Sequence, residues 1–193
     1  MRHFSFAPAL TMSGRKKKGL RGLAGKPFHP PLTDVPVGTY TAAVVFDVLS
    51  AVLYGGHEQL STELYRAATW TLLVGAAVSL LAALTGWADW HRSSEPGTQA
   101  RRTINAHAVL MLTTTALILL DIALRITTYK DDEKTPVVVL VLTILAFLIM
   151  SVGSSIGGSV VYDYGFNVET AGDHPVWHKS ETDVLPGEKA STS

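Results

Sequence analysis

Histidine is the residue type of this chain best suited to bind a metal or cofactor, and three of the seven histidines, His29, His91 and His107, are expected to converge at one membrane surface. The chain contains no cysteine. Its available ligands are therefore imidazole, carboxylate and hydroxyl groups, which suit haem iron, zinc or another divalent ion. The predicted cofactor-binding residues are His29, His91, His107, Asn105 and Tyr162, and the predicted metal ligands are His29, Asp89 and His107.

His107 has the central place in this predicted site. It stands about one turn into the third apolar stretch, where it can act as an axial or metal ligand with either His91 or His29 opposite. The alternative is anchoring alone, because His, Trp, Tyr and Asn are enriched where a membrane meets water. No close metal-ligand motif such as HExxH is present to decide between a haem b or metal site and simple anchoring.

Asp47, Thr114 and Asp121 form a second predicted set, a proton relay. Asp47 lies about twelve residues into the first apolar stretch, and we expect no basic residue at the same depth. Without a cationic partner the carboxyl is expected to be protonated and to donate to a backbone carbonyl or to Thr114. Asp121 and Arg125, one turn apart, are expected to pair and extend toward the surface. The alternative is a buried structural acid.

Four apolar stretches must position these residues: 35–54, 67–88, 104–124 and 135–162. Each is long enough to cross about 30 Å of hydrocarbon as a helix, and continuous apolar runs are not typical of a membrane barrel. Short connections favour antiparallel neighbours. The predicted fold is an all-α, integral membrane, antiparallel four-helix bundle, without an evident internal repeat or second domain.

Small residues follow one face of two of these stretches. Gly75, Ser79, Ala82 and Gly86 recur at helical spacing in the second stretch, as do Gly153 and Gly157 in the fourth. Such stripes allow membrane helices to approach closely, so we interpret both as packing surfaces inside the bundle. In the third stretch, the face that carries His107, Thr114, Asp121 and Arg125 is expected to point inward.

Basic residues set the predicted orientation. They are concentrated before the first stretch and in the second connection, at Arg2, Arg15, Lys16, Lys17, Lys18, Arg21, Lys26, Arg92, Arg101 and Arg102. The positive-inside bias then places both termini on the cytoplasmic side of the cell inner membrane. We expect a flexible basic arm at 1–28, the membrane domain at 29–169 and a disordered polar tail at 170–193.

Several short motifs occur in a fixed order along the chain, and the sequence resembles a known family in this order. They are His29-Pro30-Pro31-Leu32, Pro36-Val37-Gly38, Phe46-Asp47, Gly86-Trp87-Ala88-Asp89-Trp90, Asn105-Ala106-His107-Ala108 and Gly157-Gly158-Ser159-Val160-Val161-Tyr162. Over roughly residues 29–169 the chain is similar to an uncharacterised bacterial family of four-helix membrane domains, some of which are joined to Rieske iron–sulphur domains. The resemblance implies an electron-transfer setting in which His29, Asp47, Asp89, His107 and Tyr162 are the candidates.

The leading functional hypothesis is a haem- or metal-binding redox module. Its rivals are a cofactor-free accessory or scaffold subunit and a proton- or ion-conducting protein. No catalytic residue is predicted, since the chain has no GxSxG, GxxxxGK or GxGxxG motif, and a redox role would be electron transfer rather than hydrolysis or group transfer. The lipid bilayer is the predicted partner, together with other membrane redox proteins or a second copy. The zero net charge argues against nucleic acid.

Overall fold

The computed structural model describes residues 27–168, which form four helices and no strand. The helices are α1 (His29–Leu53), α2 (Glu58–Ser93), α3 (Gln99–Thr127) and α4 (Val137–Tyr162). All four are long and apolar enough to cross a membrane. The predicted all-helical class is therefore confirmed. The proposed basic arm and polar tail lie outside the described residues, apart from the last two positions of the arm.

Local sequence explains where the helices begin. Prolines occupy the first positions of α1, where a missing N–H costs nothing. At the start of α3, Thr98 Oγ1 accepts a hydrogen bond from the Arg101 N–H at 3.1 Å and caps the helix. Gly97, with φ of 82°, makes the turn between α2 and α3 in a conformation that favours glycine. These signals keep the connections short.

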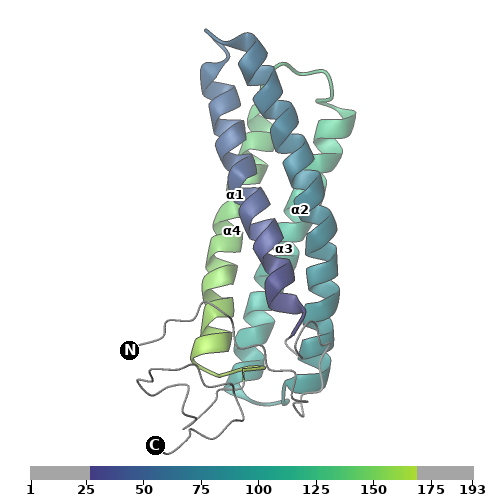
Figure 1. Ribbon diagram of the computed structural model, residues 1–193, viewed down its shortest axis with the longest axis vertical. Coiled ribbons are helices and arrows are strands. Elements are labelled where there is room, and N and C mark those ends of the chain that lie inside the picture. Colours follow the sequence, from purple (N-terminus) through teal and green to yellow (C-terminus); the bar gives the residue numbers. More distant parts are fainter. Residues whose placement is uncertain (1–26, 169–193) are drawn as a thin grey trace, which may run out of the picture.

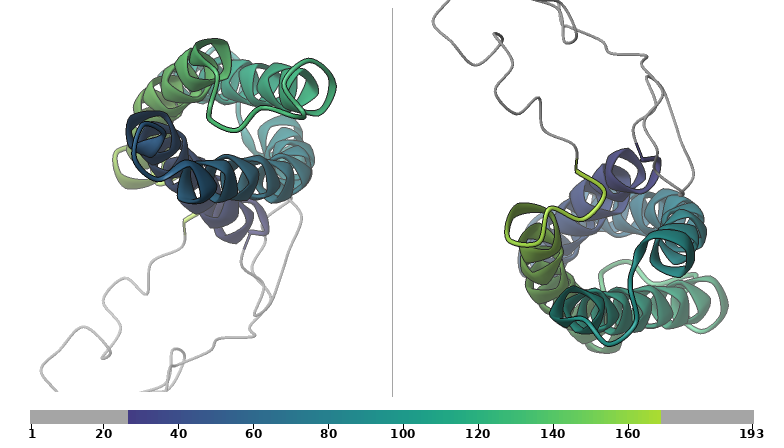
Figure 2. Two further views of the ribbon diagram at one scale, coloured as in Figure 1. Left: turned by 90° about the horizontal axis from the view of Figure 1, so that it is seen from above. Right: turned by 90° about the horizontal axis from the view of Figure 1, so that it is seen from below.

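The helices pack as two hairpins, α1 with α2 and α3 with α4. The contacts between the hairpins, α1 with α4 and α2 with α3, are less extensive, and α1 and α3 lie diagonally opposite each other (Figure 2). Successive helices run in opposite directions along the long axis of the molecule (Figure 1). We call the end at which α1 begins the imidazole end, and the end at which α1 stops the carboxylate end.

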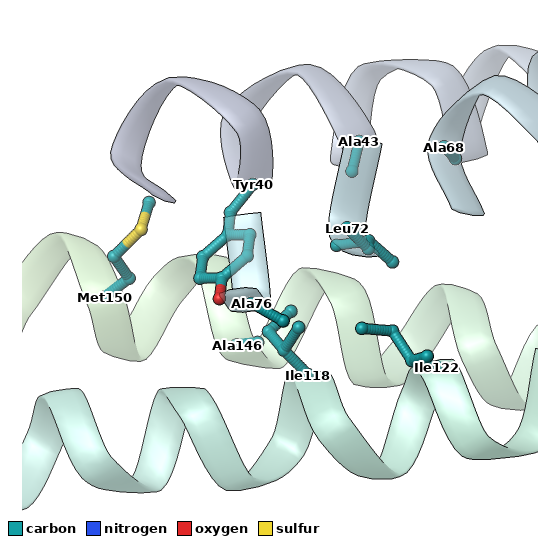
Figure 3. Close-up of a cluster of buried hydrophobic side chains, with 9 residues drawn as sticks. All are labelled: Tyr40, Ala43, Ala68, Leu72, Ala76, Ile118, Ile122, Ala146 and Met150. Carbon is teal, nitrogen blue, oxygen red and sulfur yellow. The ribbon is translucent and has the colours of Figure 1, made fainter. Parts of the chain in front are cut away.

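An apolar core fills the middle of the bundle. All four helices contribute to it, through Tyr40, Ala43, Ala68, Leu72, Ala76, Ile118, Ile122, Ala146 and Met150. Figure 3 shows Tyr40 and Leu72 of the first hairpin pointing toward Ile118 and Ile122 of the second. Large apolar side chains also cover the outer surface, as lipid-facing helices require. The core separates two polar regions, one at each end.

The second hairpin repeats the buried register of the first. Four buried residues of α1 correspond to buried residues of α3 numbered 78 higher: Pro36 to Thr114, Tyr40 to Ile118, Ala43 to Asp121, and Asp47 to Arg125. All six buried residues of α4 correspond to buried residues of α2 numbered 71 lower: Ala68, Leu72, Gly75, Ser79, Ala82 and Asp89. The expectation of no internal repeat was therefore wrong at the level of buried positions. The repeat is not evident in the sequence, because corresponding positions seldom carry the same residue type.

Candidate functional site

His29 and His107 meet inside the bundle at the imidazole end. His29 is the first residue of α1, and His107 lies in α3, the helix diagonally opposite. Their ring centroids are 6.3 Å apart, with the ring planes at 84°. The sequence left open whether His29 or His91 faces His107. The structure brings His29 to it, and we call these two residues the imidazole pair.

Each imidazole is held by the partner helix of its own hairpin. Nδ1 of His29 lies 2.8 Å from the carbonyl oxygen of Ala82 in α2, and Nδ1 of His107 lies 2.8 Å from that of Gly153 in α4. A carbonyl can only accept a hydrogen bond, so in both neutral rings Nδ1 carries the hydrogen. Nε2 then keeps its lone pair, which is the form of histidine that coordinates a metal.

A glycine one turn beyond each carbonyl makes room for the ring. A Cβ at Gly86 would lie 2.8 Å from Cε1 of His29, and a Cβ at Gly157 would lie 2.8 Å from Cε1 of His107. Both distances are too short for a real contact. The sequence predicts that these glycines allow close helix packing, whereas in the structure they make room for the imidazole rings. The internal repeat thus includes the histidine, the carbonyl and the glycine of each hairpin.

The other residues predicted for the cofactor site lie elsewhere. His91 is exposed and stacks on Trp87 at 5.7 Å between centroids, while Tyr162 is 88% exposed. Asn105 Oδ1 accepts a hydrogen bond from Trp90 Nε1 at 2.7 Å. These contacts fit the anchoring interpretation for this part of the predicted layer.

Asp89, the remaining predicted ligand, is buried in α2. Within residues 27–168, no group of three or more His, Cys, Asp or Glu side chains could hold a metal ion. His29, Asp89 and His107 are therefore not assembled as a three-ligand metal site. Of the predicted site, the structure brings His29 and His107 together, and Asp89 lies close enough to His29 for its charge to act on that imidazole.

A second polar cluster occupies the carboxylate end. Arg125 lies between two acids, with Nη2 at 2.5 Å and Nη1 at 3.0 Å from the carboxylate of Asp47, and with Nε at 2.7 Å from Asp121. The side chains of all three residues have no exposed surface. Two expectations were wrong: Asp47 has a cationic partner, and Arg125 does not extend toward the surface. The pairing of Asp47 with Arg125 could not be predicted from helical spacing, because the two residues lie on diagonally opposite helices.

Two threonines complete this cluster. Thr135 Oγ1 donates to Asp47 at 3.0 Å, and Thr143 Oγ1 lies 2.8 Å from Asp47 and 2.6 Å from Asp121. We call Asp47, Asp121, Arg125, Thr135 and Thr143 the carboxylate network. Thr114, predicted as part of a proton relay, instead donates to the backbone carbonyl of Leu110 at 3.0 Å. Neither Thr135 nor Thr143 was predicted as a site residue, although Thr143 lies on the helix that carries Gly153 and Gly157.

Buried hydroxyls extend from the carboxylate network toward the loops. The backbone N–H of Thr135 donates to Ser50 Oγ at 3.0 Å, and Ser50 Oγ lies 2.9 Å from the carbonyl oxygen of Ser61. Ser61 Oγ in turn donates to the carbonyl of Ser50 at 2.7 Å and lies 3.3 Å from the carbonyl oxygen of Glu133. These contacts join α1, α2 and the α3–α4 loop at the carboxylate end.

The fold defines the class of this protein as a multi-pass membrane protein, since it has four helices that are long and apolar enough to cross a membrane. Residues 25–170 match the family described as "Predicted membrane protein (DUF2231)". Because the match covers well over half of the chain, the protein belongs to this family, a membrane domain of unknown function. The resemblance to a four-helix membrane family is thereby confirmed. No curated protein and no solved structure matches the chain.

Proposed function

We propose that this protein is an electron-transfer component of the membrane, in which His29 and His107 would hold one haem b between the two hairpins. The observation that carries the proposal is the imidazole pair. Two imidazoles from diagonal helices lie close together, and each has its Nδ1 on a backbone carbonyl. That carbonyl contact is the usual partner of a metal-ligating histidine.

The spacing of the rings fits two ligands on one metal ion. Metal–imidazole bonds of about 2.0 Å on both sides of an ion place the two ring centroids about 6 Å apart. The observed separation is 6.3 Å. A haem needs only two protein ligands, since the porphyrin supplies four nitrogens, whereas a structural zinc ion usually takes four. The number of ligands therefore favours haem over a divalent ion.

The protein's own groups have definite roles in this proposal. The carbonyls of Ala82 and Gly153 fix the orientation of the imidazoles and raise their basicity. Gly86 and Gly157 let the rings lie against α2 and α4. Both histidines are partly buried between the helices, and limited exposure to water is one of the factors that set the reduction potential of a bound haem. When bound, the haem supplies a one-electron carrier.

Visible absorption spectroscopy of the full chain, purified in mild detergent after expression with ample haem, tests the proposal. We expect a haem spectrum that changes on reduction, with one haem for each chain. His29→Ala and His107→Ala should each lose most of the pigment. The matched control is His91→Ala, which removes an exposed imidazole at the same end and should keep it.

A colourless wild-type protein, or pigment that survives both ligand substitutions, would leave the cofactor-free accessory subunit as the better hypothesis. Electron paramagnetic resonance gives a second measurement, because the ring planes stand at 84°. Axial imidazoles close to perpendicular give a strongly anisotropic low-spin ferric signal. A spectrum typical of parallel rings would contradict the observed geometry.

The orientation in the membrane is part of the proposal. Arg92 in the last turn of α2 and Arg101 and Arg102 in the first turn of α3 flank the connection between these helices, which supports a cytoplasmic imidazole end in an inner membrane. A single cysteine introduced at Glu95, an exposed position of this connection, should then be protected from a membrane-impermeant thiol reagent in intact cells. A cysteine at Asp131 should react, and the reverse pattern would overturn the orientation. On this orientation, electron-transfer partners would approach from the cytoplasmic side.

A further inference from the structure

The hydroxyl of Thr143 has more acceptors around it than it can satisfy. Its Oγ1 lies 2.6 Å from Asp121 Oδ2, 2.8 Å from Asp47 Oδ2 and 2.8 Å from the carbonyl oxygen of Val139. A hydroxyl has a single hydrogen and so can donate to only one of these three oxygens. At least one of the other short contacts requires a hydrogen from its partner. A backbone carbonyl has none to give, so the hydrogen must sit on a carboxyl group.

The charges in the carboxylate network lead to the same conclusion. Arg125 supplies one positive charge, and Asp47 and Asp121 would together supply two negative charges. The groups that face Arg125 from α2, Tyr65 and Thr69, add no positive charge. Lys134, next to Thr135 in sequence, lies over the ring of Tyr54 instead. An uncompensated negative charge inside a membrane is costly, and one bound proton removes it.

The hydrogen-bond partners distinguish the two acids. Asp47 accepts from both terminal nitrogens of Arg125 and from Thr135, so both of its oxygens are occupied as acceptors. Asp121 Oδ1 accepts from Arg125 Nε, whereas Oδ2 meets only the Thr143 hydroxyl. A hydrogen on Asp121 Oδ2 can donate to Thr143 Oγ1, which then donates to Asp47 or to Val139.

We propose that the carboxylate network is a proton-binding site, in which Asp121 holds one proton on Oδ2 inside the membrane while Asp47 and Arg125 form an ion pair. This site is independent of haem binding, because it lies at the opposite end of the bundle. From His29 to Asp47, and likewise from His107 to Arg125, the chain advances 18 residues, or about 27 Å along a helix. The buried hydroxyls of Ser50 and Ser61 lie between the network and the loops of the carboxylate end.

Infrared spectroscopy of the full chain, labelled with carbon-13 at the aspartate carboxyl groups, tests the assignment. The wild-type protein should show a carbonyl band of a protonated aspartic acid at neutral pH. Asp121→Asn should abolish the band. Asp47→Asn should abolish it as well, because Asp121 then becomes the only counter-ion of Arg125. Arg125→Gln should roughly double it, since neither acid keeps a cationic partner.

Two further variants keep the test decisive if one of these proteins folds poorly. Thr143→Val removes the acceptor of the proposed hydrogen and should move the band to higher frequency. Asp89→Asn, at a buried acid of the imidazole end, is the matched control and should leave the band unchanged. A wild-type protein without the band, or a band that disappears in Asp89→Asn and persists in Asp121→Asn, would overturn the proposal.

Discussion

The two hairpins are alike at one end of the bundle and different at the other. At the imidazole end each contributes a histidine, a carbonyl acceptor and a glycine in the same places. At the carboxylate end the corresponding positions carry opposite charges, Asp47 in the first hairpin and Arg125 in the second. The same backbone register therefore presents two equal groups at one end and two complementary groups at the other.

The difference between identical groups at one end and oppositely charged groups at the other indicates which end needs a bound ligand. Complementary groups satisfy each other, as the guanidinium of Arg125 and the carboxylate of Asp47 do. The two imidazoles cannot hydrogen-bond to each other. Each donates its Nδ1–H to a carbonyl, so both Nε2 atoms are acceptors and neither has a hydrogen to donate. A Lewis acid between them would satisfy both, which is why the proposed cofactor belongs at the imidazole end.

The largest expected effect is at the carboxylate end, on removal of the cation. Arg125→Ala leaves two buried acids without a partner and should lower the free energy of unfolding by about 3–5 kcal/mol. Unfolding by titration with a denaturing detergent measures the change. Arg66→Ala, at an exposed arginine of α2, is the control and should have little effect. A loss at Arg125 no larger than at Arg66 would contradict the buried ion pair.

Replacing the whole charged set sharpens the same comparison. A triple variant with Asp47→Leu, Asp121→Leu and Arg125→Met removes every charge at once. It should fold with a stability close to that of the wild type or higher, since buried ion pairs are often replaced by apolar residues without loss. Its haem content should be unchanged, because the imidazole pair is separate. Loss of haem in a folded triple variant would show that the two ends depend on each other.

The equivalence of the hairpins at the imidazole end predicts equal effects of two glycine substitutions. Gly86→Ala and Gly157→Ala each place a methyl group against one imidazole, so each should lower haem content several-fold and to a similar extent. The control is Gly158→Ala, where the nearest atom to a Cβ would be 4.0 Å away. If only one of the two sensitive positions matters, the two histidines are not equivalent ligands.

A smaller effect is expected where the repeat ends. Ser50 is buried and links Thr135 and Ser61, whereas the corresponding residue of the second hairpin, Thr128, is exposed. Ser50→Ala leaves the buried backbone N–H of Thr135 without its acceptor and should cost about 1–3 kcal/mol of stability. Thr128→Ala should cost almost nothing. The same detergent titration measures both variants, and equal costs would argue against the buried hydroxyls.

The smallest effect concerns a contact between the hairpins at the loops. Tyr54 Oη donates to Glu133 at 2.9 Å, and this hydrogen bond, together with the negative charge of Glu133, raises the pKa of Tyr54. Because the pKa is raised in the folded state, the contact contributes at neutral pH and is lost as the pH rises through the folded pKa. Glu133→Gln should lower that pKa, as measured by ultraviolet titration of the phenolate. An unchanged titration would show that the contact does not persist in solution.

The sequence predicted the helices well, because four continuous apolar runs leave few alternatives for a chain in a membrane. It predicted His107 as the central ligand but could not choose between His29 and His91, since both stand at the same end of the bundle. Only packing distinguishes them: Gly86 admits the ring of His29, while His91 lies against Trp87 outside. The inward face of α3 was predicted correctly at Thr114 and Asp121, which are both buried, whereas Arg125 was expected at the surface.

The carboxylate network could not be predicted from helical spacing within one segment. Its ion pair joins α1 to the diagonal helix, and Thr143 comes from α4. The internal repeat contained the missing signal, because Asp47 and Arg125 each stand 18 residues after a histidine. Apart from the histidine at its start, that correspondence is invisible to a comparison of residue types. It becomes apparent when buried positions are compared.

The matching register of the two hairpins means that each polar site is assembled from both of them. Each half brings one imidazole and one member of the opposed charge pair, so neither half contains a finished site at either end. A haem bound by both histidines would therefore link the two hairpins at one membrane face. The ion pair between Asp47 and Arg125 links them near the opposite face. Pigment in this protein would report more than the presence of a cofactor, since it could form only after the two halves had come together in the bilayer.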